Sequence, residues 1–245
     1  MSNPESEQEF LASYDIHDYD VPLVCVDMVI FAVIDSQLNV LIAKRSQFPS
    51  KGKWALPGGF IDLNNDSSIE ATAARKLTEK TGVSTSHLEQ VKTVGNKTRD
   101  PRGWSLTVVY MALISTQHVT LNPDQSYQEL AWKPVNETGI KYRLAFDHKS
   151  LIDMCYQRLQ NKVEYTSLPV NLLEKSFSLS ELQSIFEIIL DKRIEKKSFR
   201  RRILDANILE ETGEMKTGSY RPAKLYKVKK KGKSHFFQRS IEGPR

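Results

Sequence analysis

PGGFIDLNNDSSIEATAARKLTEKTGV, residues 57–83, combines a Pro-Gly-Gly turn with a helix pattern. A serine stands where a helix would begin and a glycine where it would end, so we expect a helix over about residues 68–81. Positions 76, 79 and 80 have the spacing i, i+3 and i+4, which places Lys76, Glu79 and Lys80 on one helix face. That face therefore carries two positive charges and one negative charge.

The same stretch resembles the Nudix box, in which Gly, five residues, Glu and seven residues precede Arg-Glu-apolar-x-Glu-Glu-x-Gly-apolar. Five residues occupy the expected positions: Arg75, Leu77, Glu79, Gly82 and Val83. Three of the four expected glutamates are replaced, by Ser67, Lys76 and Lys80, and two extra residues separate Gly59 from Ser67. The chain thus resembles a Nudix domain with a degenerate box.

The replaced glutamates change what this helix face can bind. In a working Nudix site these glutamates hold Mg²⁺, which needs hard oxygen ligands in a near-octahedral array. Here Lys76, Glu79 and Lys80 give a local charge of +1 in place of −3. We expect no metal site and no catalytic residues, because Glu79 alone cannot hold a repelled divalent cation. The two lysines are able to neutralise a phosphate directly, which indicates a sensor of a nucleoside diphosphate rather than an enzyme.

Charge is distributed unevenly along the chain. Residues 191–245 contain 17 Lys and Arg against 7 Asp and Glu, and the rest of the chain contains 18 against 23. The net charges of +10 and −5 add up to the overall +5. A basic module joined to an acidic one favours a nucleic acid as the partner. For residues 227–233, KVKKKGK, a solvated lysine-rich tail and a DNA contact both stay open.

The composition also bears on the compartment. No apolar run reaches the roughly 18–20 residues that a membrane span needs, and residues 1–20 are acidic and polar, unlike a signal peptide. We therefore expect a cytoplasmic protein without membrane contact. Cys25 and Cys155 are far apart in the sequence, and we expect both to be buried free thiols.

Strand and helix patterns alternate through the first two thirds of the chain. We expect strands over residues 21–34, 38–45, 91–99, 105–115 and 129–135. Asp147 is a candidate N-cap of a helix that runs to about Lys162. With the Nudix-like helix, this pattern predicts an α/β fold, an α/β/α Nudix sandwich. We divide the chain into an N-terminal tail (1–20), a Nudix-like ligand-sensing domain (21–165) and a second domain (166–245).

The second domain has the pattern of a winged helix-turn-helix. Ser178 and Glu181 form a capping box, and apolar residues follow at helical spacing through Ile189. A turn and a basic helix, KSFRRRILDAN, come next, with Phe199 and Ile203 facing inward. Strands are expected over 208–211 and 224–229, around a tip that contains Gly213, Gly218, Arg221 and Pro222. The basic helix would enter the major groove of DNA and the hairpin would reach the backbone or minor groove. The candidate DNA contacts are Lys197, Ser198, Arg200, Arg201, Arg202, Arg221 and Lys224.

In combination and order, the two halves resemble the Nudix-related transcriptional regulators of NAD metabolism. The resemblance extends from about residue 20 to 229 and rests on PGGFIDL (57–63), ARKLTEKTGV (74–83), RDPRGW (99–104), LAFDH (144–148), LLEKSFSLSELQSIFEIIL (172–190), KKSFRRRIL (196–204) and RPAKLY (221–226). It implies a homodimer that binds a palindromic operator in double-stranded DNA, represses genes of NAD biosynthesis or salvage, and responds to ADP-ribose as an effector, with no cofactor.

The resemblance and the residue chemistry together define a candidate ligand pocket. Arg45 is positioned to clamp a phosphate, and Gly58 and Gly59 allow close backbone approach to a diphosphate. Trp54 and Phe60 either stack on the adenine or ribose or simply pack in the core. We expect Arg75 to orient Glu79 by a salt bridge. The full candidate set is Arg45, Trp54, Gly58, Gly59, Phe60, Glu79, Arg99, Arg102, Tyr110 and Asp147.

Two other functions stay open at this point. A Nudix hydrolase of ADP-ribose or a related nucleoside diphosphate derivative would release AMP and ribose phosphate in the presence of Mg²⁺. An RNA-binding protein would prefer single strands over a duplex palindrome. The sense of control, repression or activation, also stays open.

Overall fold

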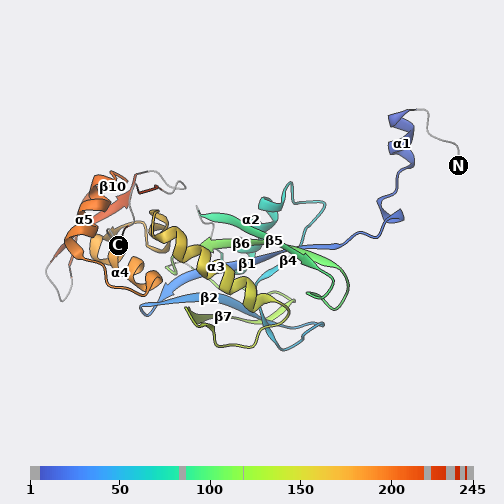
Figure 1. Cartoon of the computed structure of the whole chain (residues 1–245), viewed down its shortest axis with the longest axis horizontal. Coiled ribbons are helices and arrows are strands. Elements are labelled where there is room, and N and C mark those ends of the chain that lie inside the picture. Colours follow the sequence, from blue (N-terminus) through green and yellow to red (C-terminus); the bar gives the residue numbers. More distant parts are fainter. Residues whose placement is uncertain are drawn as a thin grey trace.

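The computed structural model of the protein describes residues 6–82, 87–117, 119–217, 222–229, 235–237 and 241. A region built on a large sheet occupies the middle of the long axis, and a smaller helical region lies at one end (Figure 1). Helix α1 (Glu7–Ser13) and the short 3-10 helix η1 (Ile16–Asp18) extend from the opposite end, and none of their residues is buried. The segment expected as a tail therefore contains two short helices.

Within the residues that the structure describes, the large sheet contains eight strands. Its main path follows the order β5-β6-β1-β2-β7-β8, with β3 paired to β2 and β4 paired to β1. The pairing of β1 with β6 is parallel, and the other pairings are antiparallel. The strands are β1 (Leu23–Ile34), β2 (Gln37–Arg45), β3 (Trp54–Ala55), β4 (Gly58–Phe60), β5 (Leu88–Asn96), β6 (Ser105–Leu113), β7 (Tyr127–Asn136) and β8 (Gly139–Ile140).

One helix covers each face of this sheet. Alternate side chains of a strand point to opposite faces, so Met28 packs in a core with Leu77 of α2 (Ile69–Thr81). Phe31 packs in another core with Ile152 of α3 (His148–Val163). The α/β/α sandwich predicted from the sequence is confirmed, and the apolar run of β1 is explained because both of its faces are covered.

The helix ends follow the capping residues that the sequence indicated. Ser68 accepts a hydrogen bond from the Ala71 amide at the start of α2, and Gly82 ends the helix with a φ of 66°. Glycine adopts this left-handed conformation without the steric cost of a side chain. Asp147 also occupies its expected N-cap position at α3, but its side chain makes no cap hydrogen bond.

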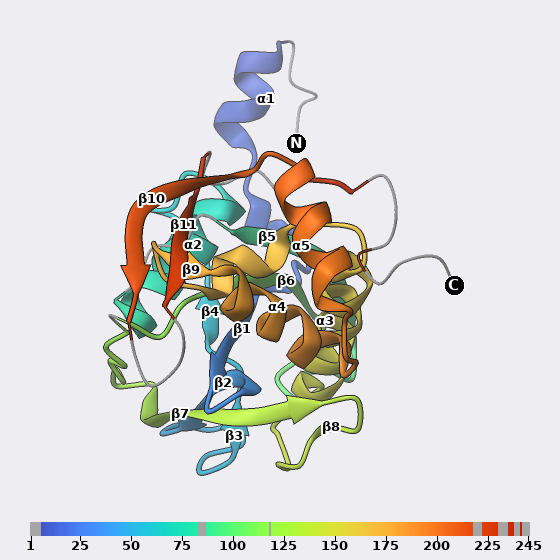
Figure 2. The same ribbon diagram turned by 90° about the vertical axis from the view of Figure 1, so that its left-hand side faces the viewer.

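The second region has the helix, turn, helix and hairpin order of a winged helix. The capping box of Ser178 and Glu181 is present, and the Phe186 and Phe199 rings meet edge to face at 5.3 Å between centroids. Figure 2 shows strands β10 and β11 running beside the two helices. The elements are η2 (Leu168–Leu172), β9 (Phe177–Ser178), α4 (Leu179–Leu190), α5 (Lys196–Asp205), β10 (Leu209–Lys216) and β11 (Ala223–Val228), with sheet order β10-β11-β9.

The hairpin differs from the sequence expectation in one respect. Strand β10 continues past the predicted end at residue 211 to Lys216. Gly213, expected at the tip, lies within β10 at a register shift between Glu211 and Met215, where its φ is 83°. An extra residue at such a bulge needs a backbone conformation that glycine supplies. Gly218 lies outside the described residues.

The two regions share one continuous core and a common junction. Leu159 and Val163 of α3 belong to the same buried cluster as Ile185 and Ile189 of α4. Residues of the C-terminal segment pair with the connection between the regions: the Ser167 amide donates to the His235 carbonyl oxygen at 2.9 Å. Thus the winged-helix region is packed against the sheet region through α3, and also through contacts of α4 with β2 and of η2 with β1 and β6.

Candidate functional site

The open face of α2 is a network of ion pairs. The Arg75 guanidinium donates to Glu79 at 2.8 Å and, through Nε, to Asp66 at 2.6 Å. The Lys76 amine lies 3.1 Å from the other Glu79 oxygen. Burial opposes ionisation of Glu79, but the bonds from Arg75 and Lys76 prevail and lower its pKa. The predicted orientation of Glu79 by Arg75 is confirmed, and both Glu79 oxygens are bonded to cations.

Lys80 does not lie on this open face, contrary to the expectation that it contacts a phosphate. Its side chain is 1% exposed, its amine bonds to the Asp124 carboxylate, and it lies over the Tyr127 ring at 4.9 Å from the centroid. Burial alone would raise the pKa of the Asp124 carboxyl, but the bond from Lys80 contributes to lowering it overall. The backbone of the adjoining loop reinforces this arrangement, because the Asn122 amide donates to the Lys80 carbonyl oxygen. Lys80 therefore fixes the loop before β7 to α2.

A second ionic cluster lies at the N-terminal end of α3. The Arg99 guanidinium donates to both Asp147 oxygens at 3.1 Å and to Asp27 at 3.2 Å. His148 lies 3.6 Å from Asp27 and accepts a hydrogen bond from the Leu56 amide at Nδ1, 2.8 Å away. Burial lowers the pKa of His148 more than Asp27 raises it, so the imidazole is neutral. We refer to Asp27, Arg99, Asp147 and His148 as the Arg99 cluster.

Burial and the neighbouring carboxylates have opposite effects on the pKa of Arg99 in this cluster. Burial alone would lower its pKa, but the hydrogen bond to Asp147 and the charge of Asp27 raise it overall. Only 4% of the Arg99 side chain is exposed. Asp147 is the more accessible carboxylate partner of Arg99, because its side chain is 23% exposed whereas that of Asp27 is 9% exposed.

The two glycines of β4 lie between the α2 face and the Arg99 cluster. A Cβ atom on Gly58 would stand 2.3 Å from the Val26 carbonyl oxygen and 2.9 Å from Asp27 Oδ1. On Gly59, which has a φ of 156°, it would stand 3.1 Å from Cε of Lys76. Gly58 is thus required by the protein's own backbone, whereas the predicted approach of a diphosphate to both glycines stays a prediction.

Further candidate residues surround this centre. Arg45 donates through Nε to the Pro49 carbonyl oxygen at 2.8 Å and stacks on the Phe146 ring at 5.1 Å. Burial lowers the pKa of Arg45, and the nearby charge of Arg102 acts in the same direction. Arg102 in turn lies 5.3 Å from the half-exposed Phe60 ring. Arg45, Arg102 and Phe60 are therefore close to one another, and their contact with a ligand stays a prediction.

Two candidates have their own structural contacts. Trp54 packs edge to face on Tyr142, with 6.5 Å between ring centroids, and lies under the Lys133 amine at 5.4 Å. Tyr110 is buried in the core beneath α2, and its hydroxyl group lies 3.1 Å from Glu70. Burial and this carboxylate raise the pKa of Tyr110 to about 12. Because Asp27 and Val29 lie on the α3 side of β1, Tyr110 is separated by the sheet from the Arg99 cluster.

Sequence reasoning missed several residues that organise the site. Asp27 was visible as the one charged residue within the apolar run of β1, and His148 follows Asp147 directly in the LAFDH stretch. Asp66 takes the position beside Arg75 one residue before the expected box glutamate. Asp124 gave no local signal, because its partner Lys80 is 44 residues away.

The basic helix α5 presents its predicted face to solvent. Phe199 and Ile203 are buried against α4, while Lys197 and Arg201 are exposed. Ser198, Arg200 and Arg202 are half-buried beside them. Glu195 caps the helix by accepting hydrogen bonds from the Lys197 and Ser198 amides. The side-chain layout expected for a recognition helix is therefore present.

The hairpin is less free to reach a partner. The Lys224 amine bonds to both Glu211 oxygens at 2.9 Å, which raises the pKa of Lys224. Contact between Lys224 and a phosphate would have to replace this bond. Arg221 lies outside the described residues.

Two features are absent from the described part of the chain. No group of three or more His, Cys, Asp and Glu side chains there is arranged to hold a metal ion. Within the same residues, no helix is long and apolar enough to cross a membrane. Cys25 and Cys155 are free thiols, and Cys155 is buried whereas Cys25 is partly buried.

Comparison with known proteins places both regions. Residues 25–155 match the NUDIX domain, and residues 169–228 match the NrtR DNA-binding winged helix domain. The chain is 46% identical over 243 residues to the ADPR responsive transcriptional repressor NtrR of Acinetobacter baylyi, covering 99% of this chain and 96% of that protein.

Solved structures give the same result. The structure of Shewanella oneidensis NrtR complexed with a 27mer DNA is 44% identical with a TM-score of 0.81, over 89% of this chain and 98% of that one. The NUDIX domain of the same NrtR, complexed with ADP ribose, is 45% identical with a TM-score of 0.58, over 63% of this chain and 99% of that one.

Proposed function

Because the chain belongs to the Nudix family and carries the NrtR type of DNA-binding winged helix domain, we propose that it is an ADP-ribose-responsive transcriptional repressor. The observation that carries the proposal is the union, in one chain, of a Nudix fold with a helix-turn-helix that exposes Lys197 and Arg201. We place the boundary between a sensing domain and a DNA-binding domain at residues 165 and 166.

The ligand site follows from the geometry of the charged groups. Arg102 lies over the Phe60 ring of β4, and Lys76 lies against Gly59. Arg99 is bonded to Asp27 beside Gly58, and Arg45 is close enough to Arg102 to feel its charge. Cations grouped around a strand of two glycines suit a diphosphate, and Phe60 and Trp54 offer aromatic surface for the adenine or ribose. Glu79 and Asp147 complete the proposed set, whereas Tyr110 lies in the core beneath α2, where its hydroxyl group is bonded to Glu70.

We propose that binding is not followed by hydrolysis. Glu79 is the one box glutamate that the sequence retains, and it is bonded to Arg75 and Lys76. Mg²⁺ would have to displace those cations and recruit further oxygen ligands. A hydrolase would instead release AMP and ribose phosphate with Mg²⁺, and that release would be abolished in Glu79→Gln.

The form of the DNA complex is also a proposal. A homodimer related by a two-fold axis would bind a palindromic operator, with half-sites separated by whole helical turns of about 10 bp. Such an operator would lie upstream of genes of NAD biosynthesis or salvage, and the protein would act in the cytoplasm. ADP-ribose would release the DNA by binding the DNA-incompetent arrangement more tightly.

Fluorescence anisotropy tests this function. Labelled duplexes from upstream of the protein's own gene and of neighbouring NAD genes are titrated with protein, and then with ADP-ribose, at fixed salt. Specific binding that ADP-ribose reverses is the expected result. A scrambled duplex and a single-stranded RNA are the controls. Equal affinity for all of these probes would contradict a sequence-specific regulator, and release of AMP in a parallel assay with Mg²⁺ would establish a hydrolase.

A further inference from the structure

Helix α3 is one continuous element between the candidate ligand site and the winged-helix region. It has 16 residues, and at 1.5 Å per residue this corresponds to about 24 Å. In Figure 1 it runs along the sheet toward the winged-helix elements. A rigid helix with one end at the candidate ligand site and the other at the winged-helix region can transmit a displacement from one to the other.

The N-terminal end of α3 is held by the Arg99 cluster rather than by its own cap. Asp147 directs its carboxylate to Arg99, with both bonds at 3.1 Å, and not to the first amides of the helix. The neighbouring His148 is bonded to the Leu56 amide, and the preceding Ala145 amide donates to the Trp54 carbonyl oxygen at 2.7 Å. A change in the partner of Arg99 therefore acts directly on the start of α3.

The C-terminal half of α3 contacts α4. The Gln160 amide nitrogen donates to the Ile189 carbonyl oxygen at 3.1 Å and to the Tyr156 hydroxyl group at 3.1 Å. Ile189 lies in the last turn of α4, where backbone carbonyl groups have no partner within the helix. This bond joins a polar side chain of the sensing domain to the end of a helix in the other domain.

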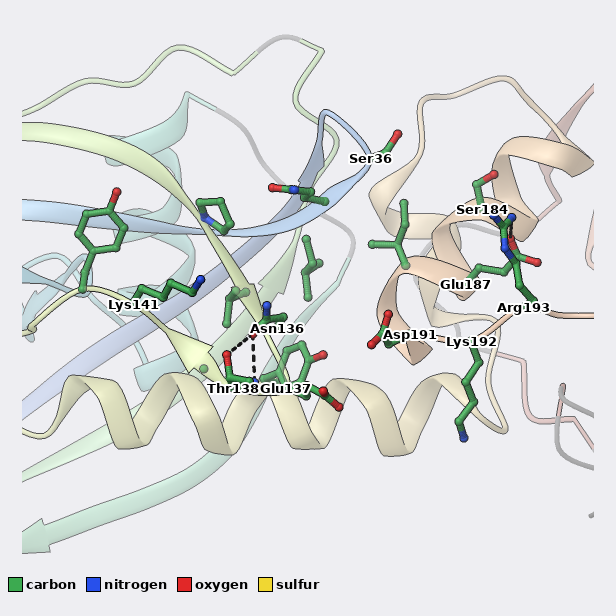
Figure 3. A pocket seen from close by; sticks show the side chains of 18 residues that line it. Ser36, Asn136, Glu137, Thr138, Lys141, Ser184, Glu187, Asp191, Lys192 and Arg193 are labelled. Carbon is green, nitrogen blue, oxygen red and sulfur yellow. Dashed lines mark hydrogen bonds and ion pairs between the residues drawn. The ribbon is translucent and has the colours of Figure 1, made fainter.

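A cleft lies beside this contact. It has a volume of about 1000 Å³, and Tyr156 and Ile188 line it. Figure 3 shows Asn136, Glu137 and Lys141 on the sheet side, facing Glu187 and Asp191 on the α4 side. The two domains are in contact through α3 and α4, with further contacts of α4 to β2 and of η2 to β1 and β6, and the cleft separates them next to the α3–α4 contact.

We propose that α3 couples the two sites: a diphosphate that takes Arg99 from Asp147 releases the start of α3, and Gln160 passes the resulting shift to α4. Released from Arg99, Asp147 is free to cap the first turn of α3, which favours a new position of that end. Gln160 is a positioning residue that contacts neither ligand nor DNA. This inference rests on the proposed function, since it explains how that ligand would act on that DNA contact.

The test compares two glutamines of the same helix. Gln160→Met keeps the length of the side chain and removes the bonds to Ile189 of α4 and to the Tyr156 hydroxyl group. Gln157→Met removes a bond to Asn161 at 3.0 Å within α3. Operator affinity is measured by anisotropy with and without saturating ADP-ribose, and ADP-ribose affinity is measured by calorimetry. Equal urea midpoints establish that both variants fold.

The expected result is a specific loss of coupling. Allosteric effectors change the affinity of a second ligand by about 5-fold to 150-fold, and we expect Gln160→Met to reduce the wild-type factor by about threefold or more. Both separate affinities should stay near those of the wild type, and Gln157→Met should respond normally. A normal response in Gln160→Met, or an equal loss in both variants, would overturn the proposal.

An independent variant acts at the other end of the helix. Asp147→Asn cannot form the ion pair with Arg99, so it should weaken operator binding in the absence of ADP-ribose, as the ligand does in the wild type. Unchanged operator affinity in Asp147→Asn would also contradict the coupling. If ADP-ribose has no effect on DNA binding by the wild-type protein, the proposed function itself fails. If the wild-type protein and Gln160→Met respond equally to ADP-ribose, only the coupling through α3 fails.

Discussion

Lys80→Met separates a structural role of Lys80 from a role in binding phosphate. The structure buries the Lys80 side chain against Asp124 and Tyr127, away from the open face of α2. Opposite charges about 4 Å apart attract by roughly 4 kcal/mol at an effective dielectric constant of 20. Because the Asp124 side chain is 47% exposed, water screens this attraction, and we expect a loss of about 1–2 kcal/mol of unfolding free energy.

Lys80→Glu, which restores the Nudix consensus at this position, should be more harmful. It replaces an attraction by repulsion between two carboxylates and leaves one of them buried at a site that is 1% exposed. Breaking a buried pair costs about 3–5 kcal/mol, so we expect about 4–6 kcal/mol with the added repulsion. The exchange variant Lys80→Glu with Asp124→Lys should recover a large part of this loss.

Urea unfolding followed by circular dichroism measures these changes, and calorimetry with ADP-ribose measures binding in the same preparations. We expect Lys80→Met to lower the urea midpoint and to leave ADP-ribose affinity within about twofold of the wild type, since the amine does not face the pocket. A large loss of ADP-ribose affinity at unchanged stability would refute the structural role.

Three further predictions test other parts of the molecule. Arg201→Ala should weaken operator binding about tenfold without changing ADP-ribose affinity, and equal losses in anisotropy and calorimetry would contradict separate sites. Burial alone would raise the pKa of Glu89, but bonds from His87, Lys162 and Arg158 lower it to about 2 from the usual 4.5. The ionised carboxylate therefore stabilises the fold above about pH 4.5, and this contribution is lost as the pH falls toward 2. Glu89→Gln should flatten this acid limb of unfolding free energy by up to about 3 kcal/mol, and an unchanged slope would argue against the ion pairs to α3. Gly58→Ala should lower stability by several kcal/mol, roughly the cost of an incompatible backbone, and should reduce ADP-ribose binding; a normal urea midpoint would show that β4 tolerates a side chain.

The helix ends could be predicted from the sequence alone. Ser68, Gly82 and the Ser178–Glu181 box act within four residues along the chain, so local spacing was enough to predict them. The inward stripe of α5 was predicted in the same way, from Phe199 and Ile203. The bulge in β10 was not, because a register shift depends on the partner strand as well as on Gly213.

Within the candidate site, a contact between residues close in the sequence was predicted, whereas contacts between distant residues were not. The salt bridge of Arg75 with Glu79 spans four residues and was confirmed. The expected phosphate contact of Lys80 was wrong, because a residue 44 positions away captures the amine. For Arg99 the sequence indicated a charge near the pocket, whereas the structure shows it bonded to Asp27 and Asp147, 72 and 48 residues away.

The sequence by itself determined the order of elements, the degenerate box and the basic face of α5. These depend on periodicity, on capping and on charges that are written in consecutive residues. Only the tertiary structure decided which charged groups are free. An unpaired buried charge is unfavourable, so each buried cation forms an ion pair with a carboxylate that the fold places beside it. Lys80 pairs with Asp124, and Arg99 pairs with Asp147 and Asp27. Tertiary packing also decides the contacts at the two ends of α3. It places Asp147 beside Arg99 of the candidate ligand site and Gln160 against Ile189 of the other domain.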